Sequence, residues 1–262
     1  MSGTAENPQD IVIRVRGLVN HFGSQTIHDG VDLAVRRGEV LGVVGGSGTG
    51  KSVLLRTIIG LNRAAAGEIE VLGQNMSKLN DAERRAIEQR WGVLFQDGAL
   101  FSSMTVAQNI EVPIREHLSM PEMLMDEIAA CKIAIVGLPE ATADKYPSQL
   151  SGGMRKRAGL ARSLSLDPEI LFLDEPTAGL DPIAAADFDQ LIRDLKISLG
   201  LTVFLVTHDL DTLFAICDRV AVLVDKKIRV GTLAEHLKDD HPWIQAYFHG
   251  PRGRAAQSGA QH

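Results

Sequence analysis

The chain is organised around one glycine-rich stretch, Gly45-Gly46-Ser47-Gly48-Thr49-Gly50-Lys51-Ser52. An apolar run precedes it at residues 40–44, and a helix-like pattern follows it at residues 53–59. This order of strand, glycine-rich loop and helix is the context in which G-x-x-x-x-G-K-[ST] indicates a phosphate-binding loop. Glycines let the backbone curl so that N–H groups converge on phosphate oxygens, and the new helix adds the positive end of its dipole. We therefore expect a bound nucleoside triphosphate, with Lys51 on the β- and γ-phosphates and the Ser52 hydroxyl on Mg²⁺.

The composition is that of a globular protein. Of the 262 residues, 45% are hydrophobic and 23% are charged, which suits one large domain with or without an inserted lobe. The net charge of −6 argues against bulk nucleic-acid binding, which usually needs a basic domain. No stretch approaches the roughly 18 consecutive apolar residues of a membrane span, and the polar, acidic start resembles neither a signal nor a transit peptide. Cys131 and Cys217 lack the spacing of redox motifs or metal ligands, so we expect reduced thiols and a cytoplasmic protein.

Two alternating patterns precede the glycine-rich stretch. Residues 11–16 and 31–35 alternate like half-buried strands, with a turn expected at residues 20–24, and they predict a small antiparallel layer. Phe22 lies in that turn, where an exposed aromatic ring can stack on a base and a buried one would only pack. Residues 1–10 are expected to be disordered.

Residues of about 100 to 160 predict a helical lobe inserted into an α/β domain. Helical periodicity occurs twice there, and Pro113, Pro121 and Pro147 are expected to break the helices. The lobe contains Met104, Met120, Met123 and Met125, either as core filling or as an adaptable partner surface. After the lobe, an amphipathic tail at residues 233–248 precedes a segment, residues 249–262, that is expected to be disordered.

Three predicted buried strands end in polar side chains. These are Gln96 after residues 91–95, Asp174 and Glu175 after residues 170–173, and His208 after residues 201–207. Because α/β proteins build sites at the carboxyl ends of strands, these side chains are candidates for chemistry. Asp174 suits a Mg²⁺ ligand held through water, and Glu175 suits a general base for an attacking water. Gln96 can orient water or a metal, although Gln96 or His208 alone would more simply be a local hydrogen-bonding residue.

The tetrapeptide Leu150-Ser151-Gly152-Gly153 is a second candidate anion site. Ser151 is a natural helix N-cap, and the two glycines leave backbone N–H groups open ahead of a basic helix. A lone Ser-Gly-Gly is weak evidence, because such tripeptides are common in linkers. Its position in a fixed series of motifs is what gives it weight.

In this order and spacing, the motifs closely resemble the nucleotide-binding subunit of an ATP-binding-cassette (ABC) transporter over residues of about 10 to 240. The tetrapeptide is the most specific piece, and the Asn-Lys-x-Asp motif that GTPases need for guanine is not found. The resemblance implies an α/β fold: a P-loop NTPase domain with a RecA-like core, an N-terminal antiparallel β layer and an inserted α-helical subdomain. This ABC ATPase domain would span residues 11–248. The implied activity is ATP hydrolysis, and the implied cofactors are ATP and Mg²⁺.

The resemblance also implies a role for each motif residue. Two copies would sandwich two ATP molecules head to tail, so that each site is completed in trans. The implied roles are Phe22 for adenine stacking, Gly45, Gly46, Ser47, Gly48, Thr49, Gly50, Lys51 and Ser52 for phosphate binding, Ser52 and Gln96 with Asp174 for Mg²⁺, Glu175 as base, His208 at the γ-phosphate, and Ser151, Gly152, Gly153 and Asp181 in trans. Met154 stands where the family commonly has glutamine, which suggests a subfamily.

The stretch at residues 95–106, with residues 113–117, 150–157 and 225–228, resembles the ATPase of the Mla/MCE type, which serves bacterial phospholipid transport and outer-membrane lipid asymmetry. This implies a peripheral place on the cytoplasmic face of the inner membrane. The implied partners are a second copy, a permease, a periplasmic lipid-binding MCE subunit and a STAS-domain protein on the helical lobe, without nucleic acid. The aromatic tail at residues 241–250 either reaches the neighbouring ATPase or packs on its own domain. The alternatives are an ABC ATPase for another solute, a non-transport ABC assembly factor, and a nucleotide-binding regulatory module.

Overall fold

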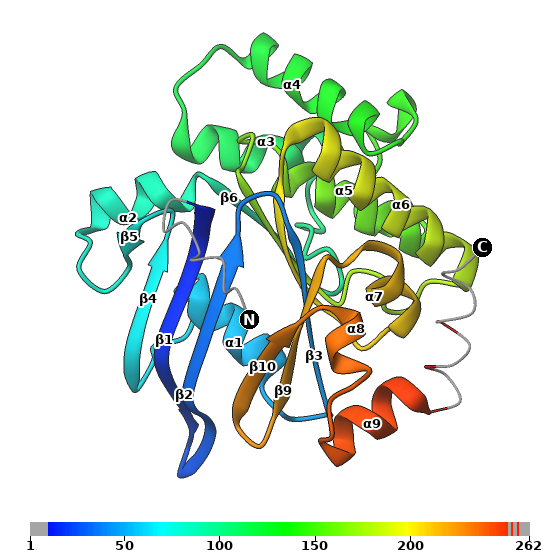
Figure 1. The fold of residues 1–262 in the computed structure, drawn as a ribbon. Helices are drawn as coiled ribbons and strands as arrows, with labels where there is room; N and C mark the ends of the chain where they lie inside the picture. The colour runs from blue at the N-terminus through cyan, green and yellow to red at the C-terminus, as the bar shows by residue number, and fades with distance from the viewer. Residues whose placement is uncertain (1–9, 251–252, 254–255, 257–262) are drawn as a thin grey trace. The chain divides into compact units, whose positions relative to one another are not determined.

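The computed structural model describes residues 10–250 together with residues 253 and 256, and it divides into two compact units (Figure 1). The first unit comprises Met1–Glu88 and Phe204–His262, and the second comprises Gln89–Val203. The expected disorder of residues 1–9 and of most of residues 251–262 lies outside the described residues. Among the residues that are described, no helix is both long and apolar enough to cross a membrane.

The first unit contains the predicted antiparallel layer, whose strands lie side by side in Figure 1. Its strands follow the order β2-β1-β4-β5, with bounds Gln25–Arg36, Ile11–Phe22, Ala66–Val71 and Gln74–Asn75. The turn expected at residues 20–24 is shorter than predicted, because Asn20 pairs with His28 and Phe22 with Gln25. The chain reverses only at residues 23 and 24, so the polar residues before them are strand residues.

A parallel strand pair carries the glycine-rich loop in the same unit. Strand β3 (Val40–Gly45) is buried throughout and pairs in parallel with β9 (Arg219–Val224), which forms a hairpin with β10 (Lys227–Gly231). Buried apolar runs of this kind are typical of parallel strands covered on both faces. Helix α1 (Lys51–Ile58) begins at the end of the loop, as the sequence predicts, and α2 is Asp81–Glu88.

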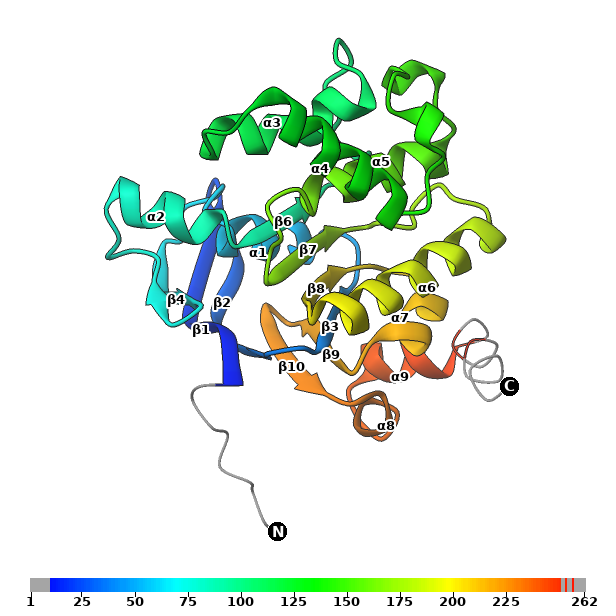
Figure 2. The ribbon, with the colours of Figure 1, turned by 90° about the horizontal axis from the view of Figure 1, so that it is seen from above.

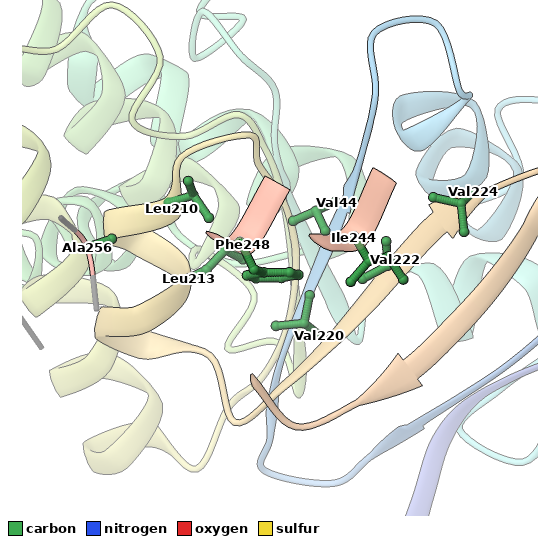
Figure 3. Close-up of a cluster of buried hydrophobic side chains, with 9 residues drawn as sticks. All are labelled: Val44, Leu210, Leu213, Val220, Val222, Val224, Ile244, Phe248 and Ala256. Atoms are coloured by element: carbon green, nitrogen blue, oxygen red, sulfur yellow. The ribbon is translucent and has the colours of Figure 1, made fainter. Parts of the chain in front are cut away.

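The C-terminal helices pack on this unit. They are α7 (Leu210–Ile216), α8 (Leu233–His236) and α9 (Pro242–His249). Figure 3 shows Ile244 and Phe248 of α9 among apolar side chains of β3, β9 and α7. Of the two alternatives for the tail, the described residues therefore show α9 packed on its own unit. The expected disorder from residue 249 onward is wrong at His249, which ends α9, and at Ala256, whose methyl group is buried in the same apolar cluster.

The second unit holds the helices of the predicted lobe. These are α3 (Val106–His117), α4 (Glu122–Ile135) and α5 (Gly152–Ser163), which lie together in Figure 2, with short 3₁₀ turns η2 (Glu140–Thr142) and η3 (Pro147–Gln149). The unit also contains the parallel strands β6 (Trp91–Leu94) and β7 (Ile170–Asp174) and the helix α6 (Pro182–Leu199). Strand β8 (Thr202–Val206) crosses the boundary between the two units.

Pro113 does not break a helix as the sequence analysis expects. It lies inside α3, whose start is fixed by a capping box between Thr105 and Gln108. A proline inside a helix loses its N–H hydrogen bond and crowds the carbonyl four residues before it, but the buried side chains of Ile110 and Ile114 hold the helix in the core on both sides of Pro113. Pro121 and Pro147 do stand where new helical turns begin.

Candidate nucleotide site

The glycine-rich loop is held in a closed conformation by its own side chains. The Lys51 ammonium donates to the carbonyl oxygens of Gly45 at 2.9 Å and Gly46 at 3.1 Å, and the Thr49 hydroxyl donates to Gly46 at 2.9 Å. Gly50 has a left-handed backbone with φ +99°, and a Cβ there would lie 2.7 Å from His28 Nε2. Glycine at this position is therefore required both by the backbone conformation and by the lack of space.

A buried polar network supports the loop from behind, and the sequence analysis missed it. The Asn20 amide donates to Thr57 Oγ1 at 3.1 Å and lies 2.9 Å from Nδ1 of the fully buried His28. An amide NH₂ only donates, so Nδ1 accepts and the ring proton of neutral His28 is on Nε2, facing Gly50. Burial lowers the pKa of His28, and the nearby Gly50 backbone opposes this shift only in part, since Nε2 forms no well-aligned hydrogen bond. Hydrophobic alternation does not detect a buried histidine.

Phe22 and His208 are the other candidate residues of the first unit. The Phe22 side chain is 78% exposed at the end of β1, so the alternative of a buried turn aromatic is wrong. It lies on the hairpin whose second strand meets the loop through Ile27 and His28 at Gly50. His208 is exposed after β8, and the Asp209 that follows it caps α7 by accepting from the Asp211 N–H at 3.0 Å.

In the second unit, the two carboxylates stand at the end of β7 as predicted. Asp174 is buried as the last strand residue. Glu175 follows with φ +52°, a left-handed conformation that is uncommon for residues other than glycine. The chain therefore turns sharply between the two acids, which gives them different surroundings although they are adjacent. Non-glycine residues in such conformations cluster at functional sites.

Lys156 ties Gln96 to Glu175, and the sequence analysis did not single it out. Lys156 lies on α5 and is only 6% exposed. Its Nζ donates to the backbone carbonyl of Gln96 at 2.6 Å and to the backbone carbonyl of Glu175 at 3.2 Å. Burial lowers the pKa of Lys156, and the negative charges of Asp97 and Glu175 partly oppose that shift. Residues 155–157 form a basic run, which suggests a solvated helix face. The sequence therefore gives no hint that Lys156 is buried.

The loop after Gln96 is fixed to α5 at two further places. Arg162 donates to the carbonyl oxygens of Gly98 at 2.9 Å and Ala99 at 2.7 Å, and its guanidinium lies 5.8 Å from the Phe101 ring centroid. Burial lowers the pKa of Arg162. A Cβ on Gly159 would come within 2.9 Å of Gly98 Cα, so a glycine is what allows this close approach. The loop thus follows α5 along three successive turns.

The tetrapeptide caps α5 and leaves its glycines open. Ser151 Oγ accepts from the Met154 N–H at 3.2 Å, as predicted for an N-cap. A Cβ on Gly152 would meet nothing within 4 Å, and one on Gly153 would meet only Leu180 at 3.9 Å. Asp181 caps α6 by accepting from the N–H groups of residues 183 and 184. A cavity of about 280 Å³ lies beside these elements, lined by Asp97, Gly152, Arg155, Lys156, Ala178, Gly179 and Leu180.

The donor chemistry fits a Mg²⁺ ion that is held largely by phosphates. Ser52, Gln96 and Asp174 offer a hydroxyl, an amide carbonyl and a carboxylate, which are the hard oxygen donors that Mg²⁺ prefers. Among the described residues, no group of three or more histidine, cysteine, aspartate or glutamate side chains is placed to hold a metal ion without a substrate. In nucleotide enzymes, one or two protein ligands usually join phosphate oxygens in holding Mg²⁺.

Comparison with known proteins decides the family. The model of the family described as "ABC transporter" matches residues 28–178, which is more than half of the chain. The chain belongs to the ABC transporter family. The predicted ABC ATPase fold is thereby confirmed, and the chain binds ATP and hydrolyses it in a reaction coupled to transport.

Individual relatives agree with this assignment. The chain is 40% identical over 253 residues to a probable ribonucleotide transport ATP-binding protein, mkl, of Mycobacterium leprae, covering 96% of this chain and 73% of that one. It is 38% identical over 226 residues to MlaF, the intermembrane phospholipid transport system ATP-binding protein of Haemophilus influenzae, covering 86% and 85%. A solved dimeric ATP-binding cassette in a post-hydrolysis state with ADP and Pi aligns with TM-score 0.76 at 28% identity, covering 84% of this chain and 98% of that one.

Proposed function

We propose that this ABC ATPase drives a transporter that moves phospholipids and maintains lipid asymmetry of a bacterial outer membrane. The observation that carries the proposal is the 38% identity to the phospholipid transport relative, over most of both chains. The alternative of another solute also has support, because the mycobacterial relative is named for ribonucleotide transport. The residues that bind and hydrolyse ATP are shared by both alternatives, so transport assays must decide between them.

Nucleotide binding is assigned to the first unit. Phe22 stacks on the adenine ring, which its 78% exposure supports, and residues 45–52 enclose the phosphates. Lys51 is flexible enough to turn its ammonium from the carbonyls of Gly45 and Gly46 toward the β- and γ-phosphates. Backbone N–H groups at the start of α1 supply the remaining positive potential.

Hydrolysis is assigned to the residues at the strand ends. Glu175 accepts a proton from the attacking water, and His208 donates to a γ-phosphate oxygen. Mg²⁺ would be held by Ser52 and Gln96, with Asp174 behind it through water, and would supply neutralisation of the charge that develops on the phosphates. The different surroundings of the two acids support these separate roles, because Asp174 is buried whereas Glu175, in a left-handed conformation, is partly exposed.

A second copy of the chain completes each site. A Cβ on Gly152 would meet no atom of the described residues within 4 Å, so a close approach by an outside group would account for a glycine there. Ser151, Gly152 and Gly153 contact the γ-phosphate bound by the other copy, and Asp181 lies in the segment that links the two sites. The arrangement is a closed twofold dimer, in agreement with the dimeric state of the solved cassette.

The remaining partners follow from the phospholipid proposal. A membrane permease binds beside the loop after Gln96, a periplasmic MCE subunit carries lipid, and a STAS-domain protein binds the lobe of α3, α4 and α5. The ATPase then lies on the cytoplasmic face of the inner membrane, bound through the permease, and takes no nucleic acid.

Purification of the chain from its native membranes, followed by mass spectrometry of proteins and lipids, tests the proposal. Recovery of a permease, an MCE protein and phospholipid is the expected result. The same complex in liposomes should transfer labelled phospholipid with ATP, and a matched Glu175→Gln complex should not. A different permease with a solute-binding protein would contradict the lipid assignment, and recovery of soluble partners alone would contradict transport.

A further inference from the structure

Helix α9 packs against β3, which leads to the glycine-rich loop, and against the start of α7, which follows His208. Its Ile244 and Phe248 are fully buried one turn apart, in a cluster that includes Val44 and Leu210 (Figure 3). Val44 lies in β3 just before the glycine-rich loop, and Leu210 begins α7 two residues after His208. The buried face of α9 therefore anchors the helix where these two elements begin.

A second face of α9 lies beside the glycine-rich loop itself. The indole ring of Trp243 lies beside Gly46, and a Cβ built on that glycine would be 3.5 Å from Nε1 and 3.9 Å from Cε2. A methyl group at Gly46 would therefore be in ordinary van der Waals contact with the ring, so the ring lies close beside the loop backbone without crowding it. The N–H edge of the indole faces the loop.

Tyr247 extends this contact to His208. Its ring stacks on Trp243 with a centroid separation of 4.8 Å and an interplanar angle of 14°. Its hydroxyl donates to the backbone carbonyl of His208 at 3.2 Å. The two stacked rings therefore extend from beside Gly46 to the backbone carbonyl of His208.

The start of α9 is fixed independently of the nucleotide elements. His241 caps the helix through Nδ1, which accepts from the Trp243 N–H at 3.2 Å. Its Nε2 then carries the proton and lies 3.0 Å from the Asp225 carboxylate in the turn between β9 and β10. Ile244 and Phe248 are fully buried and His241 caps the helix, so α9 has anchors besides the partly exposed Trp243 and Tyr247, which also pack against the apolar cluster.

We propose that Trp243 and Tyr247 are positioning residues for ATP hydrolysis, which hold the glycine-rich loop and the His208 backbone in a fixed relation. Trp243 acts through Gly46 and so affects nucleotide affinity. Tyr247 acts through the His208 carbonyl and so affects the step in which the His208 side chain contacts the γ-phosphate. Neither residue touches the nucleotide in this proposal.

Fluorescence of Trp243 provides a direct test. The chain has two tryptophans, so the full-length Trp91→Phe variant reports on Trp243 alone. We expect its emission to change saturably with ATP, and with a midpoint that matches the dissociation constant measured by equilibrium dialysis. Emission that stays constant at saturating ATP would overturn the proposed contact with the phosphate-binding loop.

Kinetics separate positioning from general packing. We expect Tyr247→Phe, which keeps the ring and removes one hydrogen bond, to lower kcat about two- to tenfold with little change in KM. Trp243→Leu should instead raise the KM for ATP. The control is His249→Ala, which removes a hydrogen bond from the same helix to the Leu237 carbonyl, away from both elements. Wild-type kcat in Tyr247→Phe, or an equal loss in His249→Ala, would refute the proposal.

Discussion

Replacing Lys156 by methionine should uncouple Gln96 from Glu175 while leaving the chain folded. Methionine fills the space of the lysine stem but donates no hydrogen bond, so two backbone carbonyls lose their shared donor. A hydrogen bond to a charged group contributes about 1.5–3 kcal/mol, which gives roughly 3–6 kcal/mol for the pair before compensation. Removal of a buried ammonium, whose burial lowers the pKa of Lys156, offsets part of this. We expect a net loss of about 1–3 kcal/mol in the free energy of unfolding.

The catalytic effect should be larger than this loss of stability. Displacement of a catalytic group by about 1 Å can cost on the order of a hundredfold in rate. Lys156→Met removes the hydrogen bonds that hold the backbone at both Gln96 and Glu175. We therefore expect kcat for ATP hydrolysis to fall about 100-fold with a smaller change in ATP affinity. Urea unfolding followed by circular dichroism measures stability, and phosphate release measures kcat. Lys156→Arg should keep most of the activity, because arginine also donates to two carbonyls and the adjacent cavity of about 280 Å³ gives it room.

Lys132→Met is the matched control. Lys132 is also 6% exposed on a helix of the same unit, but it pairs with Asp167, which belongs to no candidate motif. This variant should lose comparable stability and keep kcat within about threefold of wild type, since the geometry at Gln96 and Glu175 is unchanged. The reasoning is refuted if Lys156→Met retains wild-type kcat, or if both variants lose activity in proportion to stability.

Three further outcomes are expected. Glu175→Gln should lower ATP turnover by about 10²- to 10⁴-fold while ATP binding by filter assay is kept; rapid turnover would remove Glu175 as the base. Gly50→Ala should abolish ATP binding and cost about 1–3 kcal/mol in urea unfolding, because φ is +99° and the new methyl would meet His28; wild-type affinity would contradict this. Because burial lowers the pKa of His28, the unfolded chain binds a proton there more readily than the folded chain below about pH 6.5, and stability is lost on acidification. The free energies of unfolding at pH 7.5 and 5.5 should therefore differ more in wild type than in His28→Phe.

The features that the sequence predicted are those with local signals. The apolar run of β3, the glycines after it and the start of α1 follow one another directly, so their pattern predicts the loop without knowledge of the rest of the fold. The same holds for Ser151, whose capping of α5 depends on the residues that immediately follow it. Strand β7 was equally clear, since four apolar residues lead to the two acids.

The features that were missed depend on contacts distant in sequence. Lys156 is 60 residues from Gln96, and its burial becomes visible only when α5 is packed against the loop. His28 and Tyr247 likewise act on residues far along the chain, at Gly50 and His208. Pro113 was misjudged for the opposite reason, because a strong local rule was overridden by the buried neighbours of α3.

The missed contacts share one chemical property that bears on how the motifs work. Lys156 and Tyr247 both donate to backbone carbonyls of the motif residues, and their side chains make these bonds whatever side chain the motif residue carries. A motif therefore specifies which functional group is presented, whereas residues outside it specify where the backbone places that group. It follows that Glu175→Gln changes the chemistry at an unchanged position, and Lys156→Met changes the position of unchanged chemistry. Two chains with identical motifs can thus differ in rate through residues that no motif contains.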